Sequence, residues 1–237
     1  MFFLQPHVFL CRANRHWVIL DVNRDKYLCV DRHQFESLGP RLHGWEETPA
    51  QCMRNAPELP EDVAALGSAL LGVDILSERP DGAKNARPTV CSAPTDVPDV
   101  DLPAHLRRSP WTHALSFFMS CATASRQLRE ERFQSIVSSV RTRKHHDRDC
   151  ARPFDFERTR SLNVVFDTLR LFYPRPYLCM FDSLALVNFL AHFGLFPDWV
   201  FGVTADPFEA HCWVQAGSTV LNDTLEHVCA FTPIMHV

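Results

Sequence analysis

The first 30 residues of the chain alternate between apolar and polar positions in short runs, and a period of two is typical of half-buried β-strands. Three such runs are present, HVFLCR, HWVILDV and KYLCV. They are separated by Ala13-Asn14-Arg15 and Asn23-Arg24-Asp25, and both Asn and Asp favour turns. The pattern therefore predicts a three-stranded antiparallel meander at the start of the chain.

Apolar residues at helical spacing follow this meander. Asp31 is suited to the N-cap of a first helix, and Gly44 is its expected stop. A second helical pattern covers residues 61–71, where acidic residues in the first turn suit the helix dipole. Residues 1–80 are therefore predicted to form a small domain of three strands followed by helices.

A change in composition separates this first domain from the rest of the chain. Between Arg79 and Pro110 the sequence is rich in Pro, Asp, Ser and Ala and poor in large apolar residues, which is typical of an extended linker. We therefore place a linker at residues 81–104 and a second domain at residues 105–237.

The second domain begins with helical periodicity and ends with a period of two. Two helices are expected within residues 111–145, one at about 154–172 and one at about 179–193. After Gly194 the runs WVFGVTA and EAHCWVQA predict two strands, and STVLND predicts a turn or short strand. Helices followed by an antiparallel sheet predict a fold of the α+β class.

Composition and charge narrow the class of protein. The chain has 237 residues, 46% hydrophobic and 22% charged, which is enough for one large or two small domains with their own cores. A net charge of -4 disfavours nucleic acid as the main ligand. The nine cysteines have no regular spacing, and this fits reduced thiols in the cytoplasm better than a disulfide framework.

Neither a signal peptide nor a membrane helix is expected. The N-terminus lacks a basic region before its apolar residues, and Pro6 and His7 interrupt the apolar run. The most apolar stretch, residues 181–196, contains Asp182 and Asn188, so it is better interpreted as a buried helix. We therefore expect a cytoplasmic protein without a membrane partner.

The last third of the chain carries residues suited to nucleophilic catalysis. Cys179 stands at the start of a predicted helix, where N–H groups and the helix dipole stabilise a thiolate, although a single cysteine is more often a small buried thiol. His211 on a later strand and Asp223 after it change that expectation, because a base oriented by a carboxylate activates a nucleophile for acyl chemistry. Asp206 and Glu226 are the alternative carboxylates.

The alternation along the strand predicts how these side chains are oriented. It places His211 and Trp213 on one face of the strand and Cys212 on the other. His211 is therefore expected to face Cys179, and Cys212 is expected to face away from it.

These segments resemble the transglutaminase-like cysteine protease superfamily, and more closely the leader-processing B proteins of lasso-peptide biosynthesis. The matching segments are PRPYLCMFDSLAL, the glycine at position 194, FGVTADPFEAHCWVQ and VLND. The resemblance covers roughly residues 105–237. It implies a transglutaminase-like, papain-like cysteine protease fold for this part of the chain.

The same resemblance assigns roles to individual residues. It implies that Cys179 is the nucleophile, His211 the general base and Asp223 the carboxylate that orients the histidine. It also implies that Phe208 and Trp213 line the site, and that the reaction needs no cofactor.

The predicted meander with its helices resembles the small winged-helix-like domain that recognises the leader segments of precursor peptides. In such domains the leader adds as a strand to the edge of the third strand. By position, that edge comprises Lys26, Tyr27, Leu28, Cys29 and Val30. Ordinary packing within the meander is the alternative role for these five residues.

Together, the resemblances imply a cysteine peptidase that binds and removes the leader of a lasso-peptide precursor. Cleavage would free the core N-terminus for macrolactam formation, so the implied partners are the precursor peptide and a separate asparagine-synthetase-like cyclase. Two other functions fit the same residues. One is a transglutaminase-type acyl transferase, in which an amine resolves the thioester, and the other is a non-catalytic peptide-binding scaffold.

Two further groups of residues have simpler interpretations than a binding site. His211, Cys212, His227 and Cys229 are zinc-ligand types, but their spacing provides no chelating pair, so no metal is expected. The basic stretch at residues 126–148 is interpreted as a solvated helix face rather than a docking surface, because acidic residues interrupt it.

Overall fold

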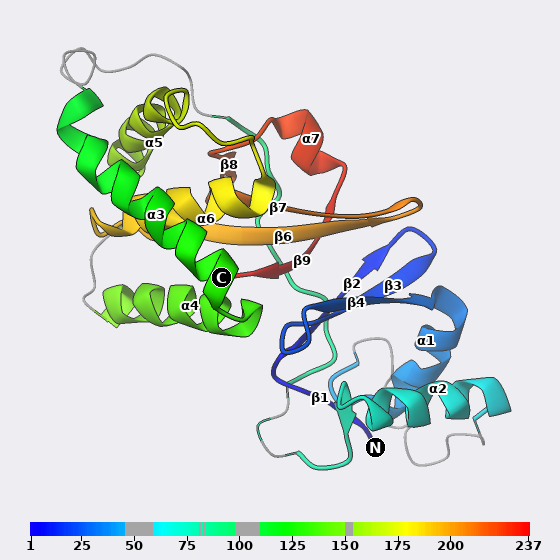
Figure 1. The fold of residues 1–237 in the computed structure, drawn as a ribbon. Helices are drawn as coiled ribbons and strands as arrows, with labels where there is room; N and C mark the ends of the chain where they lie inside the picture. The colour runs from blue at the N-terminus through cyan, green and yellow to red at the C-terminus, as the bar shows by residue number, and fades with distance from the viewer. Residues whose placement is uncertain (46–58, 81, 83, 98–109, 150–153) are drawn as a thin grey trace. The chain divides into compact units, whose positions relative to one another are not determined.

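The computed structural model of the chain describes residues 1–45, 59–80, 82, 84–97, 110–149 and 154–237 (Figure 1). The chain splits into two compact units. The first comprises Met1–Val90, Val203–Glu209 and Thr232–Met235, and the second comprises Cys91–Gly202, Ala210–Phe231 and His236–Val237. Of the predicted linker, residues 81, 83 and 98–104 lie outside the described residues, and the described remainder is divided between the units after Val90.

The antiparallel meander predicted at the N-terminus is present. Strands β2 (Val8–Ala13), β3 (His16–Asp21) and β4 (Lys26–Asp31) pair in the order β2-β3-β4. Asn14 and Asp25, at the two turns, each have a φ of 52°, a left-handed conformation that Asn and Asp adopt more readily than most residues. Each hairpin therefore turns where the sequence provides a residue suited to it.

Two helices, α1 (Arg32–Leu38) and α2 (Glu61–Gly72), follow the meander. The side chain of Asp31 accepts hydrogen bonds from the first backbone N–H groups of α1, which confirms the predicted N-cap. The expected stop at Gly44 is wrong, because α1 ends at Leu38.

The early end of α1 has a packing cause. A 3-10 turn over Gly39–Arg41 follows the helix, with a proline in its first turn. A Cβ atom at Gly39 would lie 2.4 Å from Nε1 of Trp45, so only glycine allows the indole to pack against this turn. Trp45 also contacts Trp17 and Phe35, with ring centroids 5.1 Å and 5.8 Å away, and these rings belong to the core of the first unit.

A small sheet in the first unit was not predicted. Strand β1 (Phe3–Leu4) pairs antiparallel with β5 (Leu76–Ser77). Strands of two residues are too short to show a period, so only long-range pairing between the start of the chain and the segment after α2 defines them.

The helices predicted for the second part of the chain are present, with shifted ends. They are α3 (Ala114–Glu130), α4 (Phe133–Asp149), α5 (Phe156–Arg170) and α6 (Cys179–Ala191). The strands are β6 (Asp198–Ala205), β7 (Phe208–Ala216), β8 (Thr219–Val220) and β9 (Thr232–His236), in the sheet order β8-β7-β6-β9. The short helix α7 (Leu225–Cys229) and β9 were not predicted. Helices and sheet are thus mixed, as the α+β class requires.

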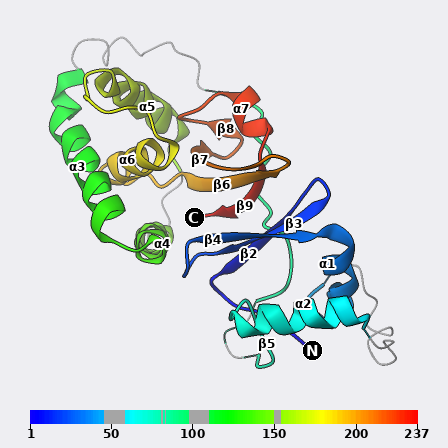
Figure 2. The ribbon, with the colours of Figure 1, turned by 45° about the vertical axis from the view of Figure 1, so that its right-hand side comes forward.

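Helix α6 is the central element of the second unit. In both views it lies between α3 and the strands β6 and β7 (Figures 1 and 2). Its residues from Phe181 to Leu190 are buried, which agrees with the interpretation of this apolar stretch as a buried helix. No helix among the described ranges has the length and apolar character needed to cross a membrane.

A close packing of aromatic rings fixes β7 against its neighbours. Trp199 on β6 is fully buried and its Nε1 donates to Oγ of Ser183 on α6, at 2.8 Å. A Cβ atom at Gly202 would lie 2.8 Å from the Trp213 ring and 2.9 Å from Cβ of Phe231. The glycine therefore allows Trp213 to lie directly against β6.

The basic stretch predicted to be a solvated helix face is partly buried instead. Lys144 on α4 is buried, forms an ion pair with Asp198 and donates to the Val237 carbonyl at 3.0 Å. Arg143 donates to Oδ1 of Asn188 on α6 at 2.9 Å, and burial lowers the pKa of its guanidinium. These two cations anchor α4 to the rest of the second unit rather than keeping it in solvent.

Candidate active site

Cys179 is the first residue of α6, and it is an exposed residue. The chain enters the helix through Leu178, whose backbone N–H donates to Oδ2 of Asp182 at 2.7 Å. The Asp182 backbone N–H in turn donates to the Leu178 carbonyl at 2.9 Å. This reciprocal pair fixes the first turn of α6, and with it the position of the thiol.

The loop before Cys179 is held by a buried arginine. The guanidinium of Arg170, at the end of α5, forms an ion pair with Asp182, and the two side chains are only 2% and 9% exposed. The same guanidinium donates to the carbonyls of Tyr173, Arg175 and Pro176, at 3.2, 3.0 and 3.1 Å. Arg170 thus ties the loop of residues 171–178 to the first turn of α6.

Strand β7 and the segment after β8 supply the other two predicted residues. His211 lies near the start of β7, and its Nε2 is 2.5 Å from Oδ2 of Asp223. Asn222 beside Asp223 accepts from the backbone N–H of Val214 on β7 at 2.7 Å, and the Thr224 N–H donates to Oδ1 of Asp223 at 2.7 Å. The carboxylate is therefore held from both sides.

The structure brings Cys179, His211 and Asp223 to one open pocket of about 240 Å³. Its lining residues are Tyr177, Leu178, Cys179, Asp182, His211, Cys212, Asn222, Asp223 and His227. Since Nε2 of His211 faces Asp223, the other ring nitrogen, Nδ1, remains for the hydrogen bond between His211 and Cys179.

The electrostatics of the pocket favour a thiolate beside an imidazolium. Hydrogen bonds from Cys212 and then from His211 lower the pKa of Cys179 from 9.0 to about 4, against the opposing effect of burial. Burial opposes a charged His211, but its hydrogen bonds to Cys179 and Asp223 raise its pKa above the ordinary 6.5. Between these two pKa values the pair is charged, which is the state that a cysteine nucleophile requires.

The orientation predicted for Cys212 is wrong. Its thiol is buried, lies 3.3 Å from Oγ of Ser183 and is hydrogen-bonded to Cys179. Ser183 also donates to the Cys179 carbonyl at 2.6 Å, so the first turn of α6 packs directly on the face of β7 that carries Cys212. Alternation along the strand separated the two faces correctly, but it did not show that Cys179 lies within reach of both His211 and Cys212.

His227 is a partner of Asp223 in the site, a role that the sequence interpretation missed. Its Nδ1 lies 3.0 Å from both carboxylate oxygens of Asp223, and its ring centroid is 4.5 Å from that of His211. The spacing of four residues between Asp223 and His227 would suit a helix, but the five residues of α7 were too few to be recognised.

The two aromatic residues expected to line the site do not line its pocket. Trp213 is fully buried and stacks beneath His211, with ring centroids 6.0 Å apart, so it supports the imidazole instead of meeting a substrate. Its position follows from the glycine at 202, which leaves room for the indole. Phe208 is exposed, belongs to the first compact unit and is absent from the pocket lining.

The five residues expected to bind a leader lie on an outer strand of the N-terminal sheet. β4 pairs with β3 and follows it in the order β2-β3-β4. Lys26, Leu28 and Cys29 are exposed, Tyr27 is half-buried and Val30 is buried. An outer strand with exposed side chains is compatible with strand addition.

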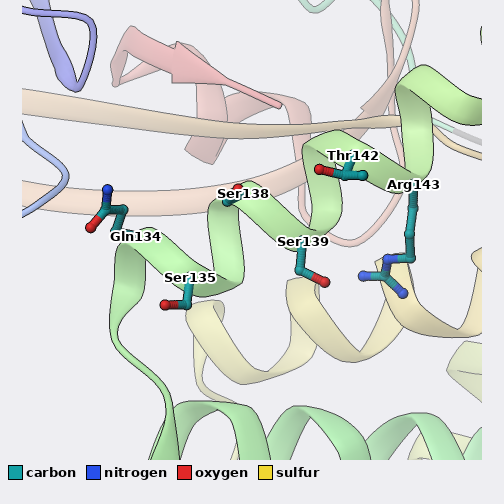
Figure 3. A pocket seen from close by; sticks show the side chains of 6 residues that line it. All are labelled: Gln134, Ser135, Ser138, Ser139, Thr142 and Arg143. Carbon is teal, nitrogen blue, oxygen red and sulfur yellow. The ribbon is translucent and has the colours of Figure 1, made fainter.

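A second cavity, of about 610 Å³, lies along α4 and contains none of the predicted site residues. Its lining is polar, with hydroxyl and amide groups and one guanidinium, from Gln134, Ser135, Ser138, Ser139, Thr142 and Arg143. Ser135, Ser139 and Arg143 follow one another along one side of the helix (Figure 3). The residues that line this cavity do not pair a nucleophile with a base. The cavity is larger than the pocket at Cys179, but it is not the candidate reactive site.

One of the comparisons with known proteins identifies a family for this part of the chain. The family model described as Transglutaminase-like superfamily, Transglut_core3, matches residues 118–236, a range that includes Cys179, His211 and Asp223. The searches of curated proteins and of solved structures returned no match.

Proposed function

The chain belongs to the transglutaminase-like superfamily, and we propose that it is a cysteine peptidase that removes the leader from a lasso-peptide precursor. One observation carries the enzymatic part of this proposal. The thiol of an exposed cysteine at a helix start is hydrogen-bonded to a histidine, and that histidine is hydrogen-bonded to a carboxylate. Members with this fold act as cysteine peptidases or acyl transferases, and both reactions need a thiol, a histidine and a carboxylate that are linked by hydrogen bonds.

The proposed reaction proceeds through an acyl-enzyme. The Cys179 thiolate attacks the carbonyl carbon of the bond between leader and core, and the first backbone N–H groups of α6, which have no acceptor within the helix, face the developing oxyanion. His211 donates its proton to the leaving amine, which becomes the core N-terminus. His211 then takes a proton from water, and the hydroxide attacks the thioester carbonyl. The C–S bond breaks, which releases the leader as a free acid and restores the Cys179 thiolate.

Asp223 has a positioning role in this scheme. Its carboxylate accepts the hydrogen bond from Nε2 of His211, so Nδ1 is aimed at the thiol and the imidazolium is stabilised. Burial opposes ionisation of Asp223, but hydrogen bonds from the Thr224 backbone N–H and from the side chains of His227 and His211 lower its pKa. The residue therefore stays ionised throughout the reaction.

The first unit is proposed to capture the leader. A leader added as a strand to β4 would gain backbone hydrogen bonds along Lys26–Asp31, and the exposed side chains there would select its sequence. The freed core N-terminus would then pass to an asparagine-synthetase-like cyclase, which joins it to an Asp or Glu side chain. Both proteins would act in the cytoplasm.

The test is to incubate the purified chain with its precursor peptide, with and without the cyclase, and to follow intact masses. Wild type is expected to split the precursor into leader and core. Cys179→Ala should abolish cleavage while leaving leader affinity unchanged, because nucleophile and capture strand belong to different units. Binding without cleavage by wild type under both conditions would refute the peptidase and favour the scaffold.

Acyl transfer is a second candidate because the family match supports both reactions equally. The two differ in what resolves the thioester. With an added primary amine, a stable leader amide would indicate transfer, whereas a free leader acid alone would indicate hydrolysis.

A further inference from the structure

We propose that His211, Asp223 and His227 form a binding site for a divalent metal ion of the zinc class, and that the bound ion switches off cleavage. The inhibitory half of this inference rests on the proposed peptidase function, whereas the binding half does not. The three side chains offer two imidazole nitrogens and a carboxylate oxygen, and these atoms all lie within 4.8 Å of one another.

Two of the three spacings between ligand atoms, those that involve Asp223, are close to what a tetrahedral ion needs. Zinc bonds of roughly 2.0–2.2 Å place neighbouring ligand atoms about 3.4 Å apart. Oδ2 of Asp223 is 2.5 Å from Nε2 of His211 and 3.0 Å from Nδ1 of His227. An ion between them therefore requires the carboxylate to separate from each imidazole by about 1 Å or less.

The site is held in place before any ion enters. Asp223 is fixed by the Thr224 N–H at 2.7 Å, and Asn222 anchors the preceding residue to β7. His211 is backed by Trp213 and Phe231, with ring centroids 6.0 and 5.0 Å away. An ion needs the distance between His211 and Asp223 to widen, and it needs His227 to adjust. His227 has the most freedom, because its side chain is 51% exposed. The three groups line an open pocket, so water can supply the fourth ligand.

This set differs from the zinc ligands considered in the sequence. Cys212 points to the Ser183 side of β7, and Cys229 does not line the pocket. Cys179 is not a ligand of the same ion. Nε2 of His211 faces Asp223, whereas the thiol is hydrogen-bonded to the other ring nitrogen, Nδ1. The prediction is therefore specific: binding survives the loss of Cys179.

Bound metal would remove the base that cleavage requires. An ion on Nε2 replaces the proton that His211 now shares with Asp223, and it leaves the only ring proton on Nδ1. To take a proton from water, the ring would have to lose that last proton and become an imidazolate, which is far less accessible than neutral imidazole. The carboxylate, drawn to the ion, also stops orienting the ring.

The closing experiment measures binding without relying on catalysis. Full-length Cys179→Ala, freed of metal with a chelator, is titrated with Zn²⁺ against a coloured chelator and with Co²⁺ for the visible absorption of a tetrahedral site. One ion per chain is expected. A double variant that carries both Cys179→Ala and His227→Gln keeps a hydrogen-bonding side chain at position 227 but loses a metal ligand. It should bind Zn²⁺ at least about tenfold more weakly than Cys179→Ala. His145→Gln, at an exposed histidine on α4, is the matched control and should bind as the parent does.

The second arm follows cleavage of the precursor by the wild type with Zn²⁺ alone. Zn²⁺ should lower the cleavage rate, and chelator should restore it. In the His227→Gln variant, Zn²⁺ should lower the rate by a smaller factor than in the wild type. The proposed site would be overturned if Cys179→Ala bound no metal, or if the double variant with His227→Gln bound metal as tightly as Cys179→Ala. Binding without inhibition would overturn the switch. A wild type that binds metal but never cuts would instead refute the peptidase and leave the metal site intact.

Discussion

Removing the Cys212 thiol should raise the pKa of Cys179. The Cys212 thiol is buried, and its hydrogen bond is the largest single cause of the lowered pKa of Cys179. The pKa of Cys212 itself is raised well above 9.0 by that bond and by burial, so this thiol keeps its proton and donates it to the thiolate. Cys212→Ala deletes the donor and leaves the His211 hydrogen bond in place.

The size of the shift follows from the strength of such a bond. Hydrogen bonds to charged groups contribute roughly 1.5–3 kcal/mol, and S–H is a weak donor, so about 1.5 kcal/mol is appropriate. At about 1.4 kcal/mol per pKa unit, the pKa of Cys179 should rise by about 1 unit. The thiolate of the wild type is lost as pH falls through about 4, and the variant should lose it about 1 unit higher.

The assay is the pH dependence of Cys179 alkylation, followed by mass spectrometry of its peptide. Burial raises the pKa of Cys11 and Cys121 to about 12, so these thiols stay protonated in the acidic range and do not compete. Cys212→Ser keeps a hydroxyl donor at the same position and is the matched control, expected to titrate close to the wild type. Identical midpoints for Cys212→Ala and wild type would refute the role of this bond.

Three other changes test the site and the packing behind it. Asp223→Asn should lower the cleavage rate by about 10²–10⁴-fold in steady-state kinetics on the precursor, because the histidine loses the carboxylate that sets its tautomer. An unchanged rate would assign the orienting role to another residue. Arg170→Leu should lower the free energy of unfolding by about 3–5 kcal/mol in urea titration, because Asp182 is left buried without its cation; a loss below 1 kcal/mol would contradict a buried pair. Gly202→Ala should lower the free energy of unfolding by about 1–3 kcal/mol, because the added methyl group overpacks the contact with Trp213. Gly72→Ala is the control, since its methyl group meets nothing within 4 Å, and it should leave stability unchanged or higher. Equal effects of the two changes would show that the neighbours of Gly202 move aside at little cost.

The local chemistry of the sequence was sufficient for most of the secondary structure. Asn14 and Asp25 stand at the turns of the meander, and Asp31 caps α1 as expected. Elements that lack a local signal were not predicted. β1 and β5 have two residues each, and α7 has five, so no period could distinguish them from loops.

For the site, the ordered triplet of Cys179, His211 and Asp223 was predicted from the sequence, because a cysteine at a helix start followed by a histidine and a carboxylate suits acyl chemistry and because the segments around them resemble a known superfamily. The tertiary structure decided what surrounds them. It placed Cys212 in contact with the thiol, buried Trp213 under the imidazole and added His227 to the carboxylate.

The sequence by itself determined which residues could carry out acyl chemistry and which segments form helices and strands, because these depend on residue type and on periods of two and 3.6. Only the tertiary structure decided the distances between them. Those distances arise from contacts such as the Trp199–Ser183 hydrogen bond and the Gly202–Trp213 approach, which join residues on different elements. Hydrogen-bond reach around Cys179 depends on this packing, and no local pattern along the chain encodes it.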